Sequence, residues 1–288
     1  MPSIEGRQAK TMVEKGLVSM SLFRGIKPND YCLKGGEIVT ICGSKGSGKT
    51  TLTAHIGANE MLPPIAWYKV CKAREEAEKL QHIGYKKAVI PSDIQHLVYS
   101  EFPLKTCNDQ GYLARPAHVL DFDRMLLPNG INDAQFFPYG AVLLVDELMN
   151  KFSARDYTRG ESMPKEMCDF LRLIRHRDIA VVTNSLVPTG ADKGMRDMSQ
   201  NYLLIVHRID DTFKNKPRTI WYCLEFDNDK SCARFCDNPR KNDVVYVPYV
   251  FVHEGDIHQC VDSQGENDKF LVGMKNREIE FKRWEVAE

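Results

Sequence analysis

Gly43-Ser44-Lys45-Gly46-Ser47-Gly48-Lys49-Thr50 matches the phosphate-binding pattern G-x-x-x-x-G-K-[ST] at every fixed position. Residues 37–42 before it form a short apolar run that predicts a buried strand, and residues 51–61 after it have the composition of a helix. A strand, a glycine-rich loop and a helix in this order are the context in which the pattern is a phosphate-binding loop, or P loop (Walker A). The stretch therefore predicts a P-loop NTPase, and a simple glycine-rich turn with an exposed lysine is disfavoured.

The residue types of this loop predict how it would bind ATP and Mg²⁺. Glycines let backbone N–H groups turn toward the phosphates, and the N-terminus of the following helix adds partial positive charge. Lys49 is expected to reach the β- and γ-phosphates, and the Thr50 hydroxyl to ligate Mg²⁺. The expected nucleotide-binding residues are Gly43, Ser44, Lys45, Gly46, Ser47, Gly48, Lys49, Thr50 and Thr51.

A second motif (Walker B) is the apolar run of residues 141–145, which ends in Asp146-Glu147. A continuous apolar run is typical of a parallel strand that helices cover on both faces. Asp146 is expected to hold Mg²⁺, and Glu147 to orient and deprotonate the attacking water. The alternative is a strand that simply ends in solvated acids. The long interval after Lys49 leaves room for a further strand, expected at 96–102, and such an inserted strand is typical of motor-type ATPases.

A third group of candidates surrounds the apolar run of residues 179–183. Asn184 at the end of this predicted strand could touch the γ-phosphate or the attacking water, although an ordinary turn explains an Asn equally well. Arg175 and Arg177 lie at the end of a helix expected over 165–177. In ring-forming ATPases such an arginine stabilises transition-state charge in the neighbouring subunit's site. Complementing the helix dipole is the equally simple alternative.

The composition of the 288-residue chain restricts its partners. Lys plus Arg and Asp plus Glu each number 39, so the formal net charge is zero. No overall field draws the chain to nucleic acid or an anionic membrane, and contact with DNA would need a local patch. The odd number of cysteines indicates free thiols in a reducing compartment. No apolar run approaches the length of about 18 residues that a membrane span needs, so no transmembrane segment is expected.

The order of the apolar runs predicts an α/β fold with a mostly parallel sheet between two layers of helices. We expect the P-loop ATPase core over residues 37–218, after an N-terminal extension over 1–36. Strand-like runs at 219–226 and 244–251 predict a β-rich C-terminal extension over 219–288.

Several motifs then follow the P loop in a characteristic order. They are Val98-Tyr99-Ser100-Glu101-Phe102-Pro103-Leu104, Gly140-Ala-Val-Leu-Leu-Val-Asp146-Glu147, and Asp169-Phe-Leu-Arg172 leading to Arg175-His176-Arg177. Over about residues 37–210 the chain thereby resembles the zonula occludens toxin-like (Zot-like) family, the filamentous-phage assembly ATPases of the FtsK-HerA superfamily. The resemblance implies a RecA/FtsK-HerA-like sheet with an additional strand, and interface arginines at Arg175 or Arg177.

The resemblance also implies an ATP-driven, Mg²⁺-dependent motor that moves single-stranded phage or viral DNA during packaging or extrusion. It implies a ring of subunits, such as a hexamer, in the host cytoplasm or held at the membrane by a membrane or capsid assembly partner. Two features differ from the family: Asn184 stands where the superfamily often has glutamine, and no transmembrane helix follows the core. Packaging in the cytoplasm is therefore favoured over extrusion through a membrane.

Two other functions remain open at this point. The first is a P-loop phosphotransferase or nucleotide-dependent switch that acts on a small molecule or protein. It would work as a monomer, without a response to DNA and without a trans arginine. The second is a weakly catalytic nucleotide-binding assembly factor with a protein partner.

Overall fold

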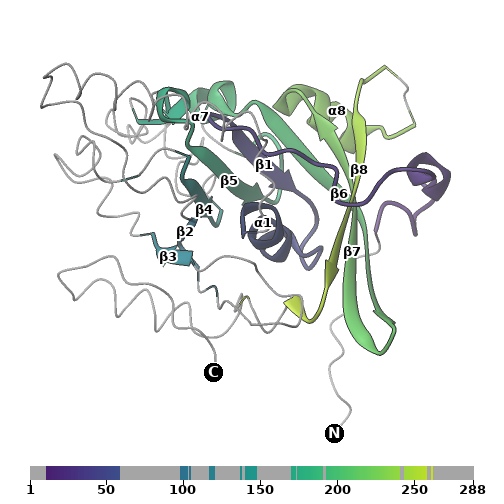
Figure 1. Cartoon of the computed structure of the whole chain (residues 1–288). Helices are drawn as coiled ribbons and strands as arrows, with labels where there is room; N and C mark the ends of the chain where they lie inside the picture. Colours follow the sequence, from purple (N-terminus) through teal and green to yellow (C-terminus); the bar gives the residue numbers. More distant parts are fainter. Residues whose placement is uncertain are drawn as a thin grey trace, which may run out of the picture.

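The computed structural model describes residues 11–58, 98–102, 104, 117–120, 137, 140–147, 170–172, 174–190, 193–240, 243–257 and 261. The strands, in chain order, are β1 (Ile38–Cys42), β2 (Val98–Ser100), β3 (Ala117–Val119), β4 (Val142–Val145), β5 (Ala180–Ser185), β6 (Asn201–Phe213), β7 (Lys216–Phe226) and β8 (Val247–Glu254). The helices are α1 (Lys49–Ala58), α7 (Lys193–Met198) and α8 (Asp229–Asp237), with 3₁₀ turns η1 (Met20–Phe23) and η2 (Ile174–Arg177). Figure 1 shows these elements around one twisted sheet.

The eight strands lie in the order β3-β2-β4-β5-β1-β6-β7-β8. Neighbours from β3 to β6 are parallel, whereas β6, β7 and β8 pair antiparallel. The prediction of a mostly parallel α/β sheet is confirmed. In the sheet, the strand inserted between β1 and β4 is β5, near whose end Asn184 lies. The strand expected at 96–102 as the inserted strand is β2, and it lies on the far side of β4.

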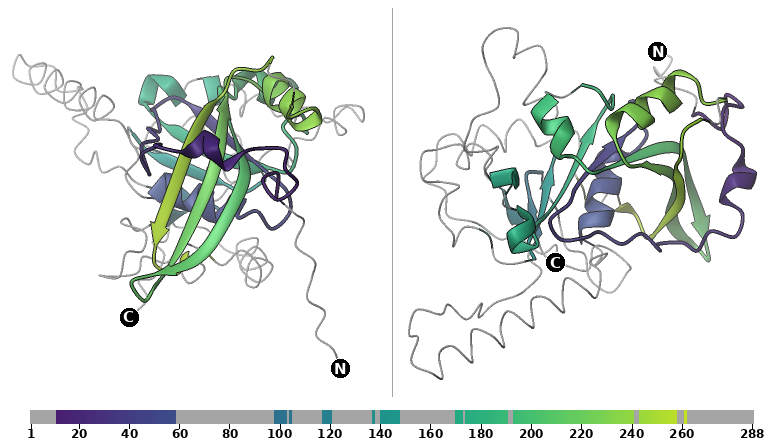
Figure 2. Two further views of the ribbon diagram at one scale, coloured as in Figure 1. Left: turned by 90° about the vertical axis from the view of Figure 1, so that its right-hand side faces the viewer. Right: turned by 90° about the horizontal axis from the view of Figure 1, so that it is seen from above.

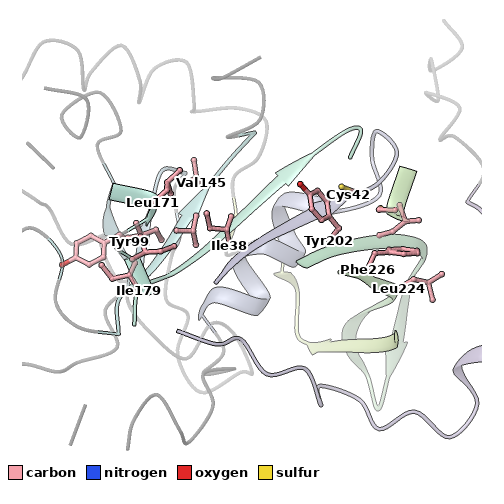
Figure 3. Close-up of a cluster of buried hydrophobic side chains, with 14 of the residues drawn as sticks. Ile38, Cys42, Tyr99, Val145, Leu171, Ile179, Tyr202, Leu224 and Phe226 are labelled. Carbon is pink, nitrogen blue, oxygen red and sulfur yellow. The ribbon is translucent and has the colours of Figure 1, made fainter. Parts of the chain in front are cut away.

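Residues on alternate positions of the strands pack into two separate cores, one on each face of the sheet. Ile38 belongs to one core, together with Tyr99, Val145, Tyr202 and others (Figure 3). Its neighbour Val39 belongs to the other. Helix α1 supplies Leu52, Ala54 and Ile56 to the second core. Helix α8 and the helical residues Phe170 and Leu171 cover the first. Because β1, β4 and β5 are buried along their whole length, they read as continuous apolar runs in the sequence.

Helix α1 approaches β4 unusually closely at Gly57. A Cβ placed on this glycine would lie 2.1 Å from Cδ2 of Leu144, so any side chain here would force the Leu144 side chain to shift. This contact holds α1 against the strand that carries Asp146. The distance between the P loop and that carboxylate is therefore set partly by helix packing.

The predicted N-terminal extension packs on the antiparallel half of the sheet. Met12 donates its backbone N–H to Val206 O (3.1 Å), and Asn29 donates its backbone N–H to Val250 O (2.9 Å). The side-chain amide of Asn29 also donates to Val252 O (2.9 Å). Figure 2 shows this segment crossing β7 and β8. The described part of the segment, from residue 11, is thus a layer of the fold.

The C-terminal region continues the core sheet. The boundary predicted after residue 218 falls inside β7, which pairs with β6 from Lys216 to Phe226. Residues 1–10 and 262–288 of the two predicted extensions lie outside the described residues. Within the described ranges, no helix combines the length and the apolar character needed to cross a membrane.

The helix expected over residues 165–177 is only partly covered by the structure. Residues 170–172 are helical, and the chain then tightens into the 3₁₀ turn η2. Asp178 follows in the left-handed region (φ 50°) and turns the chain into β5. Arg175 and Arg177 therefore lie in a tight turn rather than in an α-helix.

Candidate nucleotide site

The P loop leaves the carboxyl end of β1 in a conformation that depends on glycine. Gly46 and Gly48 have φ of 79° and 83°, which side-chain-bearing residues rarely adopt. Ser47 N donates to Ser44 O (3.2 Å), and Leu52 N donates to Gly48 O (2.9 Å) as α1 begins. The loop thus leads directly into the N-terminus of α1, a position whose backbone N–H groups and partial positive charge suit anions.

Lys49 folds back over this loop. Its Nζ donates to Gly43 O (3.2 Å) and Ser44 O (3.1 Å). Burial lowers the pKa of Lys49, while the nearby carboxylates of Glu147 and Asp146 act in the opposite direction. A partly buried amine that donates to two loop carbonyls can exchange those partners for phosphate oxygens and gain a full countercharge.

Thr50 and Asp146 come together although they lie far apart in the sequence. The Thr50 hydroxyl donates to Asp146 Oδ1 across 3.2 Å. Burial raises the pKa of Asp146, and the hydrogen bond from Asn184 counters that rise. A carboxylate and a hydroxyl are hard oxygen ligands of the kind that Mg²⁺ prefers. The donor set therefore fits this metal.

Asn184 lies between the P loop and the Walker B strand. It pairs with Ile41 in the strand register and is buried. Its side-chain amide donates to Asp146 Oδ1, and its Oδ1 accepts the backbone N–H of Glu147 (3.4 Å). This side chain thus holds the Asp146 carboxylate and the backbone of Glu147 together.

Glu147 has a strained backbone. Its φ of 49° is uncommon for a residue other than glycine, and such strain concentrates at functional sites. The left-handed turn ends β4 abruptly and leaves the Glu147 side chain exposed at the carboxyl edge of the sheet.

Sequence reasoning did not identify Glu101 as part of this site. Its Oε2 accepts the backbone N–H of Asp146 (3.2 Å), and its own N–H donates to Leu144 O (3.0 Å). Glu101 follows the end of β2, as Asp146 follows β4. The sequence does carry a signal for Glu101, because an acidic residue directly follows a parallel strand both at Glu101 and at Asp146.

Arg175 and Arg177 lie apart from these groups. They precede β5, whereas Asn184 is near its carboxyl end. The Cα of Arg175 packs beside Gly36, ahead of β1, and Arg177 O accepts the backbone N–H of Gly140, ahead of β4. Both arginines are therefore at the amino edge of the sheet, opposite the P loop.

No protein-family model matches the chain, and no curated protein sequence matches it. Among solved structures, it is similar to the N-terminal domain of zonular occludens toxin from Neisseria meningitidis (18% identity, 79% of this chain and 100% of that chain covered, TM-score 0.45). It is also similar to the genome packaging NTPase B204 from Sulfolobus turreted icosahedral virus 2 in complex with ATP-gammaS (12%, 59% and 73%, TM-score 0.32). A third is the flagellar accessory protein FlaH from Methanocaldococcus jannaschii (11%, 66% and 79%, TM-score 0.34).

All three TM-scores are below 0.5, so these likenesses carry no argument about this chain. The strand order and the glycine-rich loop after β1 establish the P-loop NTPase fold independently of them.

Proposed function

We propose that this chain binds ATP with Mg²⁺ at the P loop and hydrolyses it. The observation that carries the proposal is the meeting of Thr50 and Asp146 at 3.2 Å beside a glycine-dependent loop. A hydroxyl at the start of a helix and a carboxylate at the end of a strand have no structural need to converge there. A metal that both ligate explains the convergence.

In this proposal each side chain has a separate task. Backbone N–H groups of the loop and Lys49 bind the phosphates, and Thr50 and Asp146 hold Mg²⁺. When bound, Mg²⁺ neutralises charge on the β- and γ-phosphate oxygens. Glu147 accepts a proton from the attacking water, since its exposed carboxylate adjoins the metal-binding Asp146. Asn184 holds Asp146 and Glu147 in position through its hydrogen bonds to both residues.

We further propose that hydrolysis drives movement of DNA by an oligomeric ring. Support comes from the glutamate that directly follows the metal-binding aspartate and from the strand inserted between β1 and β4. The site within one subunit, as far as the structure describes it, contains no arginine on the side of Asp146 and Asn184. An arginine from a neighbour could therefore complete it.

The test is the ATPase rate per subunit, measured against protein concentration with and without single-stranded and double-stranded DNA. Lys49→Ala should abolish binding and turnover, and Glu147→Gln should bind ATP without cleaving it. Lys214→Ala and Glu254→Gln, which change exposed side chains away from the site, serve as matched controls. Absence of hydrolysis by the unaltered chain would refute the ATPase.

The proposal of a ring-forming DNA motor is tested by the same experiment. A rate per subunit that rises with protein concentration and with single-stranded DNA supports the ring-forming motor. A rate that changes neither with protein concentration nor with single-stranded DNA would instead favour the phosphotransferase or nucleotide-dependent switch.

A further inference from the structure

A pocket of about 470 Å³ adjoins the P loop on the side of β6. Gly43, Ser44 and Ser47 form part of its wall, so the pocket is continuous with the proposed phosphate site. Its volume lies in the range of small-molecule sites. Neither Asp146 nor Asn184 lines it, although the loop directly after β5 does, through Leu186 and Val187.

This position determines which end of a bound nucleotide would face the pocket. Mg²⁺ and the lysine of a P loop contact the β- and γ-phosphates, and Thr50 and Asp146 place the metal toward β5 and β4. With the metal on that side, the α-phosphate and the nucleoside would lie toward β6.

One wall of the pocket is apolar and exposed. Leu186 and Val187 are 49% and 55% exposed, and they belong to a small set of large apolar side chains that are exposed among the described residues. The turn that carries them is braced by Ser185, whose hydroxyl donates to Val187 O (2.8 Å) and accepts from Val187 N (3.4 Å). A rigid apolar surface open to water is suited to a flat ring such as a nucleobase.

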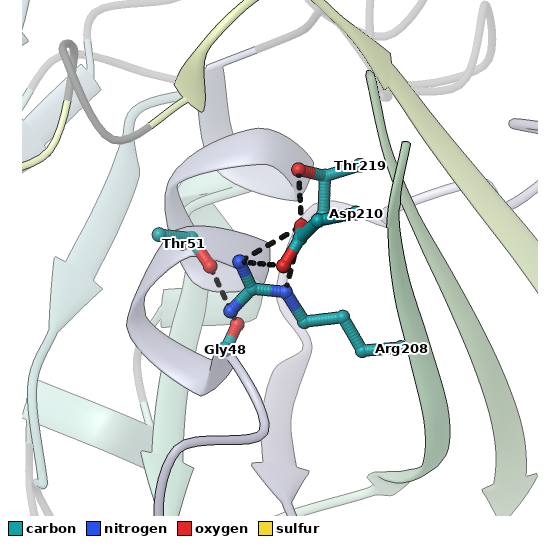
Figure 4. Close-up of polar contacts among 5 residues, drawn as sticks. All are labelled: Gly48, Thr51, Arg208, Asp210 and Thr219. Atoms are coloured by element: carbon teal, nitrogen blue, oxygen red, sulfur yellow. Dashed lines mark hydrogen bonds and ion pairs between the residues drawn. The ribbon is translucent and has the colours of Figure 1, made fainter. Parts of the chain in front are cut away.

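The opposite wall holds a cation beside the first turn of α1. Arg208 donates through Nε (3.1 Å) and Nη2 (2.9 Å) to Asp210 Oδ1, which also accepts from Thr219 (2.8 Å; Figure 4). A Cβ on Gly48 would lie 2.7 Å from Nη1 of Arg208, so the guanidinium packs directly against the P-loop backbone. Its side chain is only 14% exposed.

A cation at a helix N-terminus is electrostatically unfavourable, because the helix end carries partial positive charge. Asp210 compensates part of this cost, but its side chain is 57% exposed and its attraction is screened by water. An anion bound at the start of α1 would add to this compensation. Arg208 is therefore placed as an anion ligand on the β6 side of the P loop.

The N-terminal segment closes the pocket from a third side. Thr11 Oγ1 bonds to Nδ1 of His207 (2.9 Å), and Met12 is tied to Val206 by a backbone hydrogen bond. These residues belong to a lining that mixes polar and apolar side chains, and polar groups of this kind orient a bound nucleoside.

We propose that this pocket binds the nucleoside half of ATP, with Leu186 and Val187 covering the base and Arg208 contacting the α-phosphate. The inference rests on the proposed nucleotide site. It assigns base recognition to the loop after β5, β6 and the N-terminal segment, none of which belongs to the P-loop motif.

The test compares the binding of ATP and inorganic tripolyphosphate, both with Mg²⁺, by titration calorimetry on the full chain. Tripolyphosphate offers the phosphates without the nucleoside. The unaltered protein should bind ATP at least about tenfold more tightly than tripolyphosphate. Burial of the base against the apolar wall contributes a binding free energy that corresponds to this ratio or more. Val187→Ser should weaken ATP binding by about fivefold to tenfold and leave tripolyphosphate binding unchanged.

Arg208→Gln should weaken both ligands, because both carry a phosphate at its position. Val245→Ser, which alters a valine that is 86% exposed and outside the pocket, is the matched control and should change neither. Equal affinity of the unaltered protein for ATP and tripolyphosphate, or an unchanged ATP affinity in Val187→Ser, overturns the pocket proposal alone. Failure of both ligands to bind overturns the nucleotide site itself.

Discussion

Asn184 donates its side-chain amide to the Asp146 carboxylate and accepts the backbone N–H of Glu147 through its own carbonyl. A single buried amide thus links β5 to the end of β4. Both acceptor and donor of the side chain are used, which fixes its orientation. The Asp146 carboxylate and the backbone of Glu147 therefore depend on Asn184 for their position.

The first prediction is that Asn184→Ala lowers kcat far more than it changes ATP affinity. Loss of the amide frees Asp146 and Glu147 to move, and misplacement of catalytic groups by about 1 Å costs roughly 100-fold in rate. Steady-state kinetics and ATP titration measure the two quantities separately. Asn201→Ala is the control, because Asn201 bonds Glu37 (3.2 Å) at the amino end of β6. A normal kcat in Asn184→Ala would remove this residue from the mechanism.

The second prediction concerns the close contact between α1 and β4. Gly57→Ala should lower the free energy of unfolding by about 1–3 kcal/mol through overpacking against Leu144, although alanine is intrinsically the better helix former by about 1 kcal/mol. Urea unfolding measures the change. In the double variant with Leu144→Ala the new methyl group gains space, so the double variant should be more stable than the sum of the two single effects predicts. A stabilised Gly57→Ala would mean that α1 does not approach β4 this closely.

The elements that the sequence predicts are those with a local signal. The apolar runs behind β1, β4 and β5 are continuous because these strands are buried on both faces, and the P loop follows from its glycines. Asn184 was a plausible candidate for the same reason, since it ends such a run. Its hydrogen bonds to Asp146 and Glu147 were not predictable, because they depend on β5 lying between β1 and β4.

The remaining features depend on contacts between distant segments. The attachment of residues 11–29 to β6 and β8 leaves no periodic pattern in the sequence. The pocket combines five separate segments of the chain. Helix α8 was missed despite a readable signal: Asn228 caps it by accepting the N–H of Ser231 (2.8 Å), as asparagine at an N-cap commonly does. Arg208 carries no sequence motif at all.

The third prediction is a loss of stability in mild acid caused by two buried histidines. Nδ1 of His55 lies 3.2 Å from Nδ1 of His253. Burial and the neighbouring His253 lower the pKa of His55 to about 3, and burial lowers the pKa of His253 to about 4. The unfolded chain takes up these protons near pH 6.5, before the folded chain does, so stability falls as the pH drops from about 6.5 toward 4. The slope is at most about 1.4 kcal/mol per pH unit for each histidine.

Urea unfolding between pH 7.5 and 4.5 measures this slope. The variant His55→Gln/His253→Gln should lose less stability over that range than the unaltered chain, while His176→Gln, which changes an exposed histidine, should keep the original slope. Equal slopes in all three proteins would exclude the buried pair as the cause.

The last prediction is that Arg175 or Arg177 of one subunit completes the site around Lys49 and Glu147 of its neighbour. Within one subunit, the length of β5 separates these arginines from Asn184 by about 20 Å at 3.3 Å per residue. They cannot reach the site of their own chain without unfolding that strand. A catalytic role for either arginine therefore requires a head-to-tail ring, in which the amino edge of one sheet meets the carboxyl edge of the next.

Mixing inactive variants tests this arrangement. Glu147→Gln subunits keep both arginines, and Arg177→Ala or Arg175→Ala subunits keep Glu147. In a ring assembled from equal amounts of two such variants, about a quarter of the interfaces contain both intact parts, and ATPase activity should return to a comparable fraction. Mixing Glu147→Gln with Lys49→Ala is the control, because both changes lie in the same half of the interface and no mixed interface is intact. An arginine variant that hydrolyses ATP normally by itself, or one whose activity mixing does not restore, is not the trans ligand, since only a residue supplied across the interface can be replaced by a neighbour.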